Sequence, residues 1–224
     1  YDGWASGGNE EWSYIHLLPS FRKLETDTDI HDAFHGSDGP VPVVRHKPEN
    51  WLPLQHSFKA SCLDQGYAEI YDHNNPDATG FGPFPMNNPN GVRMSTALSY
   101  INPNRHRLNL TIRPNVLVRR ILIEDGRATG VEVESGGEVF QMEAGEIILS
   151  AGAIASPQVL MLSGIGPAEH LQEKGIAVVA DLPGVGKNLR DHPLVAVRVK
   201  TKDDFPLDPD APRIQTVLRY TASG

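Results

Sequence analysis

The segment from Glu146 to Gly164 places the strongest constraint on the fold of this chain. The run Glu146-Ile147-Ile148-Leu149-Ser150 has the apolar pattern of a short strand that is buried on both faces. The small residues Ala151-Gly152-Ala153 follow, and Ser156 and Pro157 then stand where the N-cap and first position of a helix are expected. This order predicts a strand, a tight turn and a helix. The turn suits either close packing or a ligand, since a helix N-terminus attracts anions such as phosphate.

The rest of the sequence alternates between helical and strand patterns. Apolar spacing and terminal residues predict helices within 13–25, over 51–65 and over about 167–175. Residues 71–94 are rich in Asn, Pro and Gly, which predicts a long loop. Asp125-Gly126 predicts a hairpin turn. Strands are predicted over 108–112, 116–123, 128–133, 139–142, 176–180, 194–200 and 214–220.

Charge and cysteine content exclude several classes of protein. The chain has 20 basic and 28 acidic residues, a net charge of −8, which argues against binding to nucleic acid or to anionic membranes. No run reaches the ~18 apolar residues that a membrane-spanning helix needs. Cys62 is the single cysteine, so an internal disulfide framework and an all-cysteine metal site are excluded. We expect a reducing, cytoplasmic compartment.

Several nucleotide-binding and hydrolase motifs begin in this sequence but are not completed. Gly164-Ile165-Gly166 and Gly184-Val185-Gly186 start like dinucleotide-binding turns, yet Glu169 and Leu189 stand at the position of the third glycine. A Gly-x-Ser-x-Gly nucleophile turn does not occur in the sequence, which argues against many hydrolases. The chain is therefore not expected to hold a nucleotide by itself.

Histidines suggest two further sites. His31 and His35 have the spacing of a helical zinc site, which keeps a zinc hydrolase among the alternatives. The glycines and proline that follow would end such a helix, and no third ligand has a matching spacing, so we favour loop histidines and predict no metal site. A Ser/His/Asp nucleophilic set could be assembled from Ser163, His170, Asp191 and His192. We do not favour this set, because Asp191 and His192 are sequence neighbours whose side chains would have to face each other.

The segment 152–167 resembles the second signature of the glucose–methanol–choline (GMC) flavin oxidoreductases at nearly every fixed position. The resemblance extends over most of the chain and is nearest to the choline dehydrogenase-like branch. It includes Tyr1-Asp2-Gly3-Trp4-Ala5, His35-Gly36-x-x-Gly39-Pro40, Arg93-x-Ser95, Asn109-Leu110, Gly130-Val131-Glu132 and the run 182–192.

The resemblance implies FAD as the cofactor and a role for three residues. In the family, the backbone of a valine in the strand after the Asn-Leu strand lies against the flavin adenine, which points to Val118. The family's strand–Ala-Gly turn passes the ribose–pyrophosphate side of the flavin, which points to Ala151 and Gly152. The family's Gly-x-Gly-x-x-Gly turn and its catalytic histidine have no counterpart here. We therefore expect an internal fragment that supplies no catalytic residue.

The implied fold is α/β (mixed α+β), with a partial FAD-binding, Rossmann-like domain and part of an antiparallel-sheet substrate domain. We expect residues 1–25 to form a linker helix region after the flavin-covering loop. Residues 26–94 are assigned mainly to the substrate domain and 95–192 mainly to the FAD-binding domain. Residues 193–224 would start the substrate-domain sheet.

The implied parent protein is an FAD-dependent oxidoreductase that moves a hydride from the CH–OH group of a small-molecule alcohol to the flavin. A flavin-bound lyase of the same family, such as a hydroxynitrile lyase, and a non-catalytic binding fragment are the alternatives. We expect no nucleic-acid partner, and we expect the 224-residue chain alone to be inactive.

Overall fold

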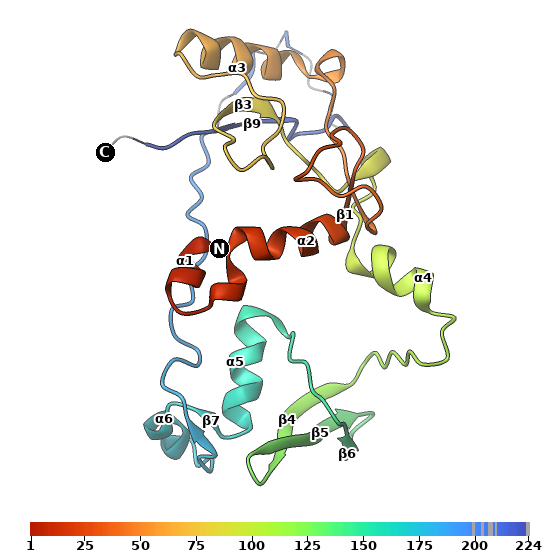
Figure 1. Cartoon of the computed structure of the whole chain (residues 1–224), viewed down its shortest axis with the longest axis vertical. Helices are drawn as coiled ribbons and strands as arrows, with labels where there is room; N and C mark the ends of the chain where they lie inside the picture. Colours follow the sequence, from red (N-terminus) through yellow and green to blue (C-terminus); the bar gives the residue numbers. More distant parts are fainter. Residues whose placement is uncertain (199, 203, 206–207, 209, 223–224) are drawn as a thin grey trace. The chain divides into compact units, whose positions relative to one another are not determined.

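The computed structural model describes the chain except for residues 199, 203, 206–207, 209 and 223–224. The chain forms two compact units: unit 1 contains residues 1–110 and 201–224, and unit 2 contains residues 111–200. Both units combine helices with strands, so the predicted mixed α/β class is confirmed (Figure 1). Among the described residues, no helix has the length and apolar character needed to cross a membrane.

Unit 1 consists of short helical segments and two strand pairs. Strand β1 (Glu25–Asp27) runs parallel to β2 (Val41–Val43), and β3 (Gly80–Pro83) runs antiparallel to β9 (Thr216–Arg219). The helical segments are α1 (Asp2–Ser6), η1 (Glu10–Trp12), α2 (Tyr14–Leu24), η2 (Pro48–Asn50), α3 (Pro53–Asp64), η3 (Pro89–Gly91), η4 (Ala97–Ile101) and α4 (Asn102–Asn104).

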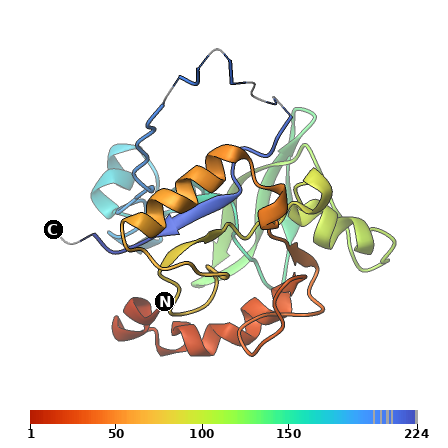
Figure 2. The ribbon, with the colours of Figure 1, turned by 90° about the horizontal axis from the view of Figure 1, so that it is seen from above.

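The helices predicted within 13–25 and 51–65 are confirmed as α2 and α3. Helix α3 lies along the β3–β9 ribbon (Figures 1 and 2), where Trp51, Cys62 and Phe81 form a buried cluster. The strand predicted over 214–220 is confirmed as β9. The long loop predicted over 71–94 is wrong at Gly80–Pro83, because β3 forms there by pairing with residues more than a hundred positions later in the chain.

Unit 2 is built around a three-stranded antiparallel sheet in the order β4-β5-β6. Helix α5 packs on the first strand of this sheet, as Figure 1 shows. Short strands β7 and β8 form a separate parallel pair. The elements are β4 (Leu117–Glu124), β5 (Arg127–Ser135), β6 (Glu138–Glu143), α5 (Gly152–Leu162), β7 (Ile165–Gly166), α6 (Ala168–Glu173) and β8 (Ala180–Asp181).

The turn between β4 and β5 has the geometry that its two residues predict. Asp125 has a φ of 50° and Gly126 a φ of 77°, the pair of positive angles that a tight hairpin turn with the sheet's right-handed twist requires. The register places Val118 opposite Val133, and Val133 and Ile121 are buried. The hairpin prediction and the strand predicted over 139–142, which is β6, are both confirmed.

Helix α5 begins five residues before the predicted start. Gly152 is its first residue, and Pro157 lies inside the helix instead of at its first position. The hydroxyl oxygen of Ser156 still supports the helix start, because it accepts a hydrogen bond from the backbone N–H of Ala151 at 3.0 Å. Gly164, with a φ of 82°, follows the last turn as predicted. The helix predicted from about 167 to 175 is confirmed as α6.

Three predicted strands do not form among the described residues. Segments 108–112 and 146–150 have no strand structure, and neither do residues 194–198 and 200; residue 199 lies outside the described residues. The strand predicted over 176–180 is reduced to a short strand at Ala180–Asp181. A strand needs a neighbour for its N–H and C=O groups, and no described strand pairs with these segments. Apolar Leu108 and Ile148 are accordingly exposed.

Candidate functional site

A pocket of about 740 Å³ lies in unit 2 between strand β4 and helix α5. Residues 116–120 form the strand side, and Glu132 and Glu134 extend it onto β5. The helix side consists of Ala151, Ala155, Gln158, Val159 and Leu162. The pocket is therefore an apolar slot with charged groups on the sheet side, within the size range of small-molecule sites.

Two of the three residues predicted to contact the cofactor line this pocket together. Val118 belongs to β4, and Ala151 lies directly before α5, 33 positions later in the chain. Val118 is 39% exposed, so a ligand in the slot could contact it. Gly152 does not line the pocket but follows Ala151 as the first residue of α5. The structure thus brings the predicted residues to the junction of one strand and one helix.

Gly152 is required by its backbone conformation. Its φ of 86° lies in the left-handed region that L-residues with a side chain rarely adopt. A Cβ atom built on Gly152 would have no atom within 4 Å, so a side chain would enter open space.

The first turn of α5 is available to an anion. Ala151 is the N-cap residue and has no side chain that could accept hydrogen bonds from the first-turn N–H groups. The helix is 11 residues long, and its dipole adds partial positive charge at this end. An apolar slot beside an uncapped helix start can accept a flat ring together with a phosphate group.

Ion pairs across the β4–β5 hairpin hold the charged side of the slot in place. Arg120 donates a hydrogen bond to Glu132 at 2.9 Å, and Arg119 donates one to Glu134 at 3.1 Å. The hydrogen bond from Arg120 lowers the pKa of Glu132, which therefore stays ionised over the ordinary pH range. Both arginines remain about half exposed, so the pairs orient the side chains more than they stabilise the fold.

Ser163 is a residue whose role the sequence did not reveal. Its hydroxyl accepts a hydrogen bond from the backbone N–H of Ile121 at 2.8 Å and donates one to the carbonyl of Val159 at 2.6 Å. The hydroxyl thus both accepts and donates a hydrogen bond in the protein interior, and this arrangement does not favour the nucleophilic set considered from the sequence. The one local feature in the sequence that could have pointed to this role is the position of Ser163 directly before Gly164, at the end of the helix.

The histidine pair considered for zinc does not form a helical site. Residues 31–35 form turns, His31 is exposed, and His35 is buried beside Asp32, with Nδ1 2.7 Å from the carboxylate. Among the described residues, Glu25, Asp27 and His35 bring ligand atoms within 4.8 Å of one another. The guanidinium of buried Arg45 donates two hydrogen bonds to the carboxylate of Asp27, so this carboxylate is already paired with a cationic side chain.

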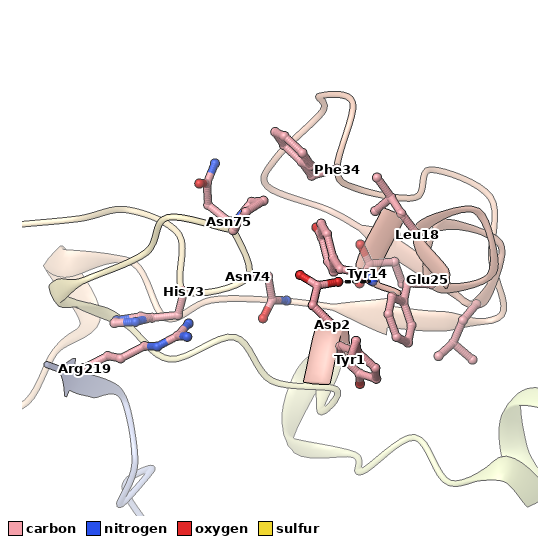
Figure 3. Close-up of a pocket in the computed structure, with 13 residues that line it drawn as sticks. Tyr1, Asp2, Tyr14, Leu18, Glu25, Phe34, His73, Asn74, Asn75 and Arg219 are labelled. Atoms are coloured by element: carbon pink, nitrogen blue, oxygen red, sulfur yellow. Dashed lines mark hydrogen bonds between the residues drawn. The ribbon is translucent and has the colours of Figure 1, made fainter. Parts of the chain in front are cut away.

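Unit 1 contains a second pocket of about 640 Å³, drawn in Figure 3. Asp2 accepts a hydrogen bond from the backbone N–H of Tyr14 at 2.9 Å at one end, and His73 and Arg219 lie together at the other. Burial, followed by nearby carboxylates including Glu25, raises the pKa of Tyr14, which therefore remains a neutral phenol. None of the residues predicted for cofactor binding lies in this pocket.

Comparisons with known proteins agree with the resemblance noted in the sequence. Residues 1–194 match the family described as GMC oxidoreductase. An oxygen-dependent choline dehydrogenase of Photobacterium profundum is 44% identical over 193 residues, which are 86% of this chain and 34% of the relative.

Solved structures give the same result for the fold. A pyridoxine 4-oxidase from Mesorbium loti aligns with a TM-score of 0.77 and 31% identity over 82% of this chain and 36% of its own. An FAD-dependent oxidoreductase from Chaetomium thermophilum aligns with a TM-score of 0.76 and 30% identity, over 82% of this chain and 34% of its own. The chain spans less than half the length of the curated relatives it matches.

Proposed function

Because this chain belongs to the GMC oxidoreductase family, whose members bind FAD, we propose that it is part of an enzyme that oxidises the CH–OH group of a small-molecule alcohol. The observation that carries the proposal is the slot between β4 and α5, where Val118 and Ala151 meet beside an uncapped helix start. FAD supplies the hydride-accepting chemistry when it is bound. The tasks of this chain are to bind and orient the cofactor.

The residues at the slot fit a dinucleotide cofactor. We assign the backbone of Val118 to the adenine and the Ala151-Gly152 turn to the ribose–pyrophosphate side. The open space at Gly152 would admit a ligand close to the backbone. The uncapped first turn of α5 would favour the negative charge of a pyrophosphate. The apolar side chains of Val159 and Leu162 would exclude water from the other wall.

We assign no catalytic residue to this chain. Proton removal from an alcohol needs a base within hydrogen-bond reach of the hydroxyl, and none of the nine histidines stands in the context that the family uses. We propose that the catalytic base lies in another part of the full-length protein. The names of two similar proteins, a choline dehydrogenase and a pyridoxine 4-oxidase, favour alcohol oxidation over the lyase alternative.

The domain assignments and the compartment are part of the same proposal. We assign residues 95–192 mainly to the FAD-binding domain, 26–94 and 193–224 mainly to the substrate domain, and 1–25 to a linker region. Supporting observations are the slot within unit 2 and the separate pocket within unit 1. We assign the protein to the cytoplasm because Cys62 is free and buried.

The test uses the full-length protein that carries this chain. It is purified with its flavin, made anaerobic and mixed with a panel of alcohols that includes choline and pyridoxine. Loss of the visible flavin band with one of them, and formation of the aldehyde, is the expected result. Cleavage of a cyanohydrin without flavin reduction would identify the lyase, and a purified full-length protein without flavin would favour the non-catalytic alternative.

A further inference from the structure

The hydroxyl of Ser163 connects the two walls of the slot. It accepts a hydrogen bond from the backbone N–H of Ile121 in strand β4. It donates a second one to the carbonyl of Val159, one turn earlier in helix α5. Ser163 is 8% exposed and Ile121 is equally buried, so water does not readily replace either bond. The connection joins residues 42 positions apart in the sequence.

The residues beside this connection are the ones that line the slot. Val159 and Leu162 belong to the helix wall, and Leu162 precedes Ser163 directly. On the strand, Ile121 lies three residues after Val118, and the pairing of β4 with β5 is irregular between Val118 and Arg120. An irregular pairing leaves this part of β4 with fewer regular hydrogen bonds to β5. The hydrogen bond from Ile121 to Ser163, three residues after Val118, therefore matters more for the position of Val118.

We propose that Ser163 is a positioning residue that sets the separation of β4 and α5 and thereby the fit of the cofactor against Val118. The inference rests on the proposed function, since it takes the slot to be part of the FAD site. A single small hydroxyl that both accepts and donates has one orientation that serves both bonds, which fixes strand and helix relative to each other. Alanine would leave the N–H of Ile121 buried without an acceptor.

The experiment compares Ser163→Ala and Ser163→Cys with a matched control in the full-length protein. Ser57→Ala is the control, because the Ser57 hydroxyl also donates to a carbonyl four residues earlier, that of Pro53 in α3, but is exposed and lies in unit 1. Each variant is stripped of flavin and titrated with FAD by fluorescence, at a temperature where circular dichroism shows the apoprotein folded.

We expect Ser163→Ala to weaken FAD binding roughly tenfold, the scale for residues that act through packed neighbours. Ser163→Cys, whose thiol is a weak donor and acceptor of similar size, should fall between alanine and the wild type. Ser57→Ala should leave the affinity unchanged. If Ser163→Ala does not fold, a weakened affinity in Ser163→Cys still supports the proposal.

A merely structural serine gives a different result. Lower thermal stability of the Ser163 apoproteins, with FAD affinity equal to that of the wild type, would overturn the positioning role. Failure of the proposed function is distinguishable, because the wild-type full-length protein would then bind no FAD in the same titration.

Discussion

Arg45 donates two hydrogen bonds from Nη1 to the two carboxylate oxygens of Asp27, each 2.8 Å long, and both side chains are buried in unit 1. Its Nη2 donates a third to Asp72 at 2.8 Å. One guanidinium thereby joins strand β1 to the segment before β3. The carboxylate of Asp27 also accepts the backbone N–H groups of Asp29 and Ile30, so the first turn after β1 depends on it as well.

Replacement of Arg45 should therefore destabilise unit 1 strongly. We expect Arg45→Met to lower the free energy of unfolding by about 3–5 kcal/mol, because it leaves Asp27 charged and buried without its partner. Lys59→Met is the control, since Lys59 pairs with Glu69 at the surface and should cost less than about 1 kcal/mol. Urea titrations followed by circular dichroism measure both. Equal losses in the two variants would contradict the assigned importance of the buried pair.

Substitution of Gly152 should lower both the stability of the protein and its affinity for FAD, and the two effects can be measured separately. Gly152→Ala forces a side chain into a positive φ, and we expect a loss of about 1–2 kcal/mol in stability. Gly66→Ala is the matched control, because Gly66 has a φ of 84° and its added Cβ would also meet open space, but it lies outside the slot. Both variants should lose similar stability, and only Gly152→Ala should also lose FAD affinity. Equal FAD affinity in the two variants would place Gly152 away from the cofactor.

Proline at Val118 tests the strand wall. Val118→Pro removes one backbone N–H from β4, and we expect the full-length protein to retain less FAD after desalting. Val139→Pro makes the same change in β6 of the same sheet; Val139 does not line the slot, and this variant should retain flavin. The flavin-to-protein ratio is measured together with circular dichroism. Full flavin occupancy in a folded Val118→Pro variant would remove Val118 from the adenine site.

His73 should make stability depend on pH. Burial lowers the pKa of His73 below its usual 6.5, and Arg219 acts in the same direction while Asp72 opposes it. The unfolded chain therefore takes up a proton on His73 at a higher pH than the folded chain, so stability should fall as the pH drops below about 6.5. His73→Gln should flatten this dependence in thermal unfolding between about pH 5 and 7. His31→Gln, at an exposed histidine, is the control, and an unchanged slope in His73→Gln would contradict the prediction.

The 224-residue chain alone should not retain FAD. Its sequence has no complete Gly-x-Gly-x-x-Gly turn, and the assigned contacts cover only part of a long cofactor. We expect an essentially colourless protein after incubation with excess FAD and desalting. A flavin band near one equivalent, or alcohol-dependent reduction of a dye, would show that the chain carries a complete site.

Local chemistry made part of the fold predictable. Asp125-Gly126 predicted the β4–β5 hairpin, and the predicted ends of α3 and α6 lie beside Gly66 and Gly175, which have positive φ. A positive φ is a property of one residue and its neighbours, so such features can be predicted locally. The choice of Val118, Ala151 and Gly152 came from the family resemblance. Without the structure, nothing in their spacing placed Val118 and Ala151 in one slot.

Pairings between distant residues were outside the reach of local patterns. Apolar runs at 108–112 and 146–150 predicted strands, yet a strand forms only where another strand accepts its hydrogen bonds. The opposite error occurred at Gly80–Pro83, where a segment of glycine and proline became β3 because β9 pairs with it.

The sequence by itself determined the family, the cofactor class, the β4–β5 turn and the approximate limits of helices α2, α3 and α6. The tertiary structure alone decided that Ser163 holds Ile121, that Arg45 neutralises Asp27, and that the side chain of Gln215 bridges Asn50 and Leu52. The physical reason is that turns and helix ends depend on neighbouring residues. A buried polar group instead takes whichever partner the folded chain brings within hydrogen-bond distance.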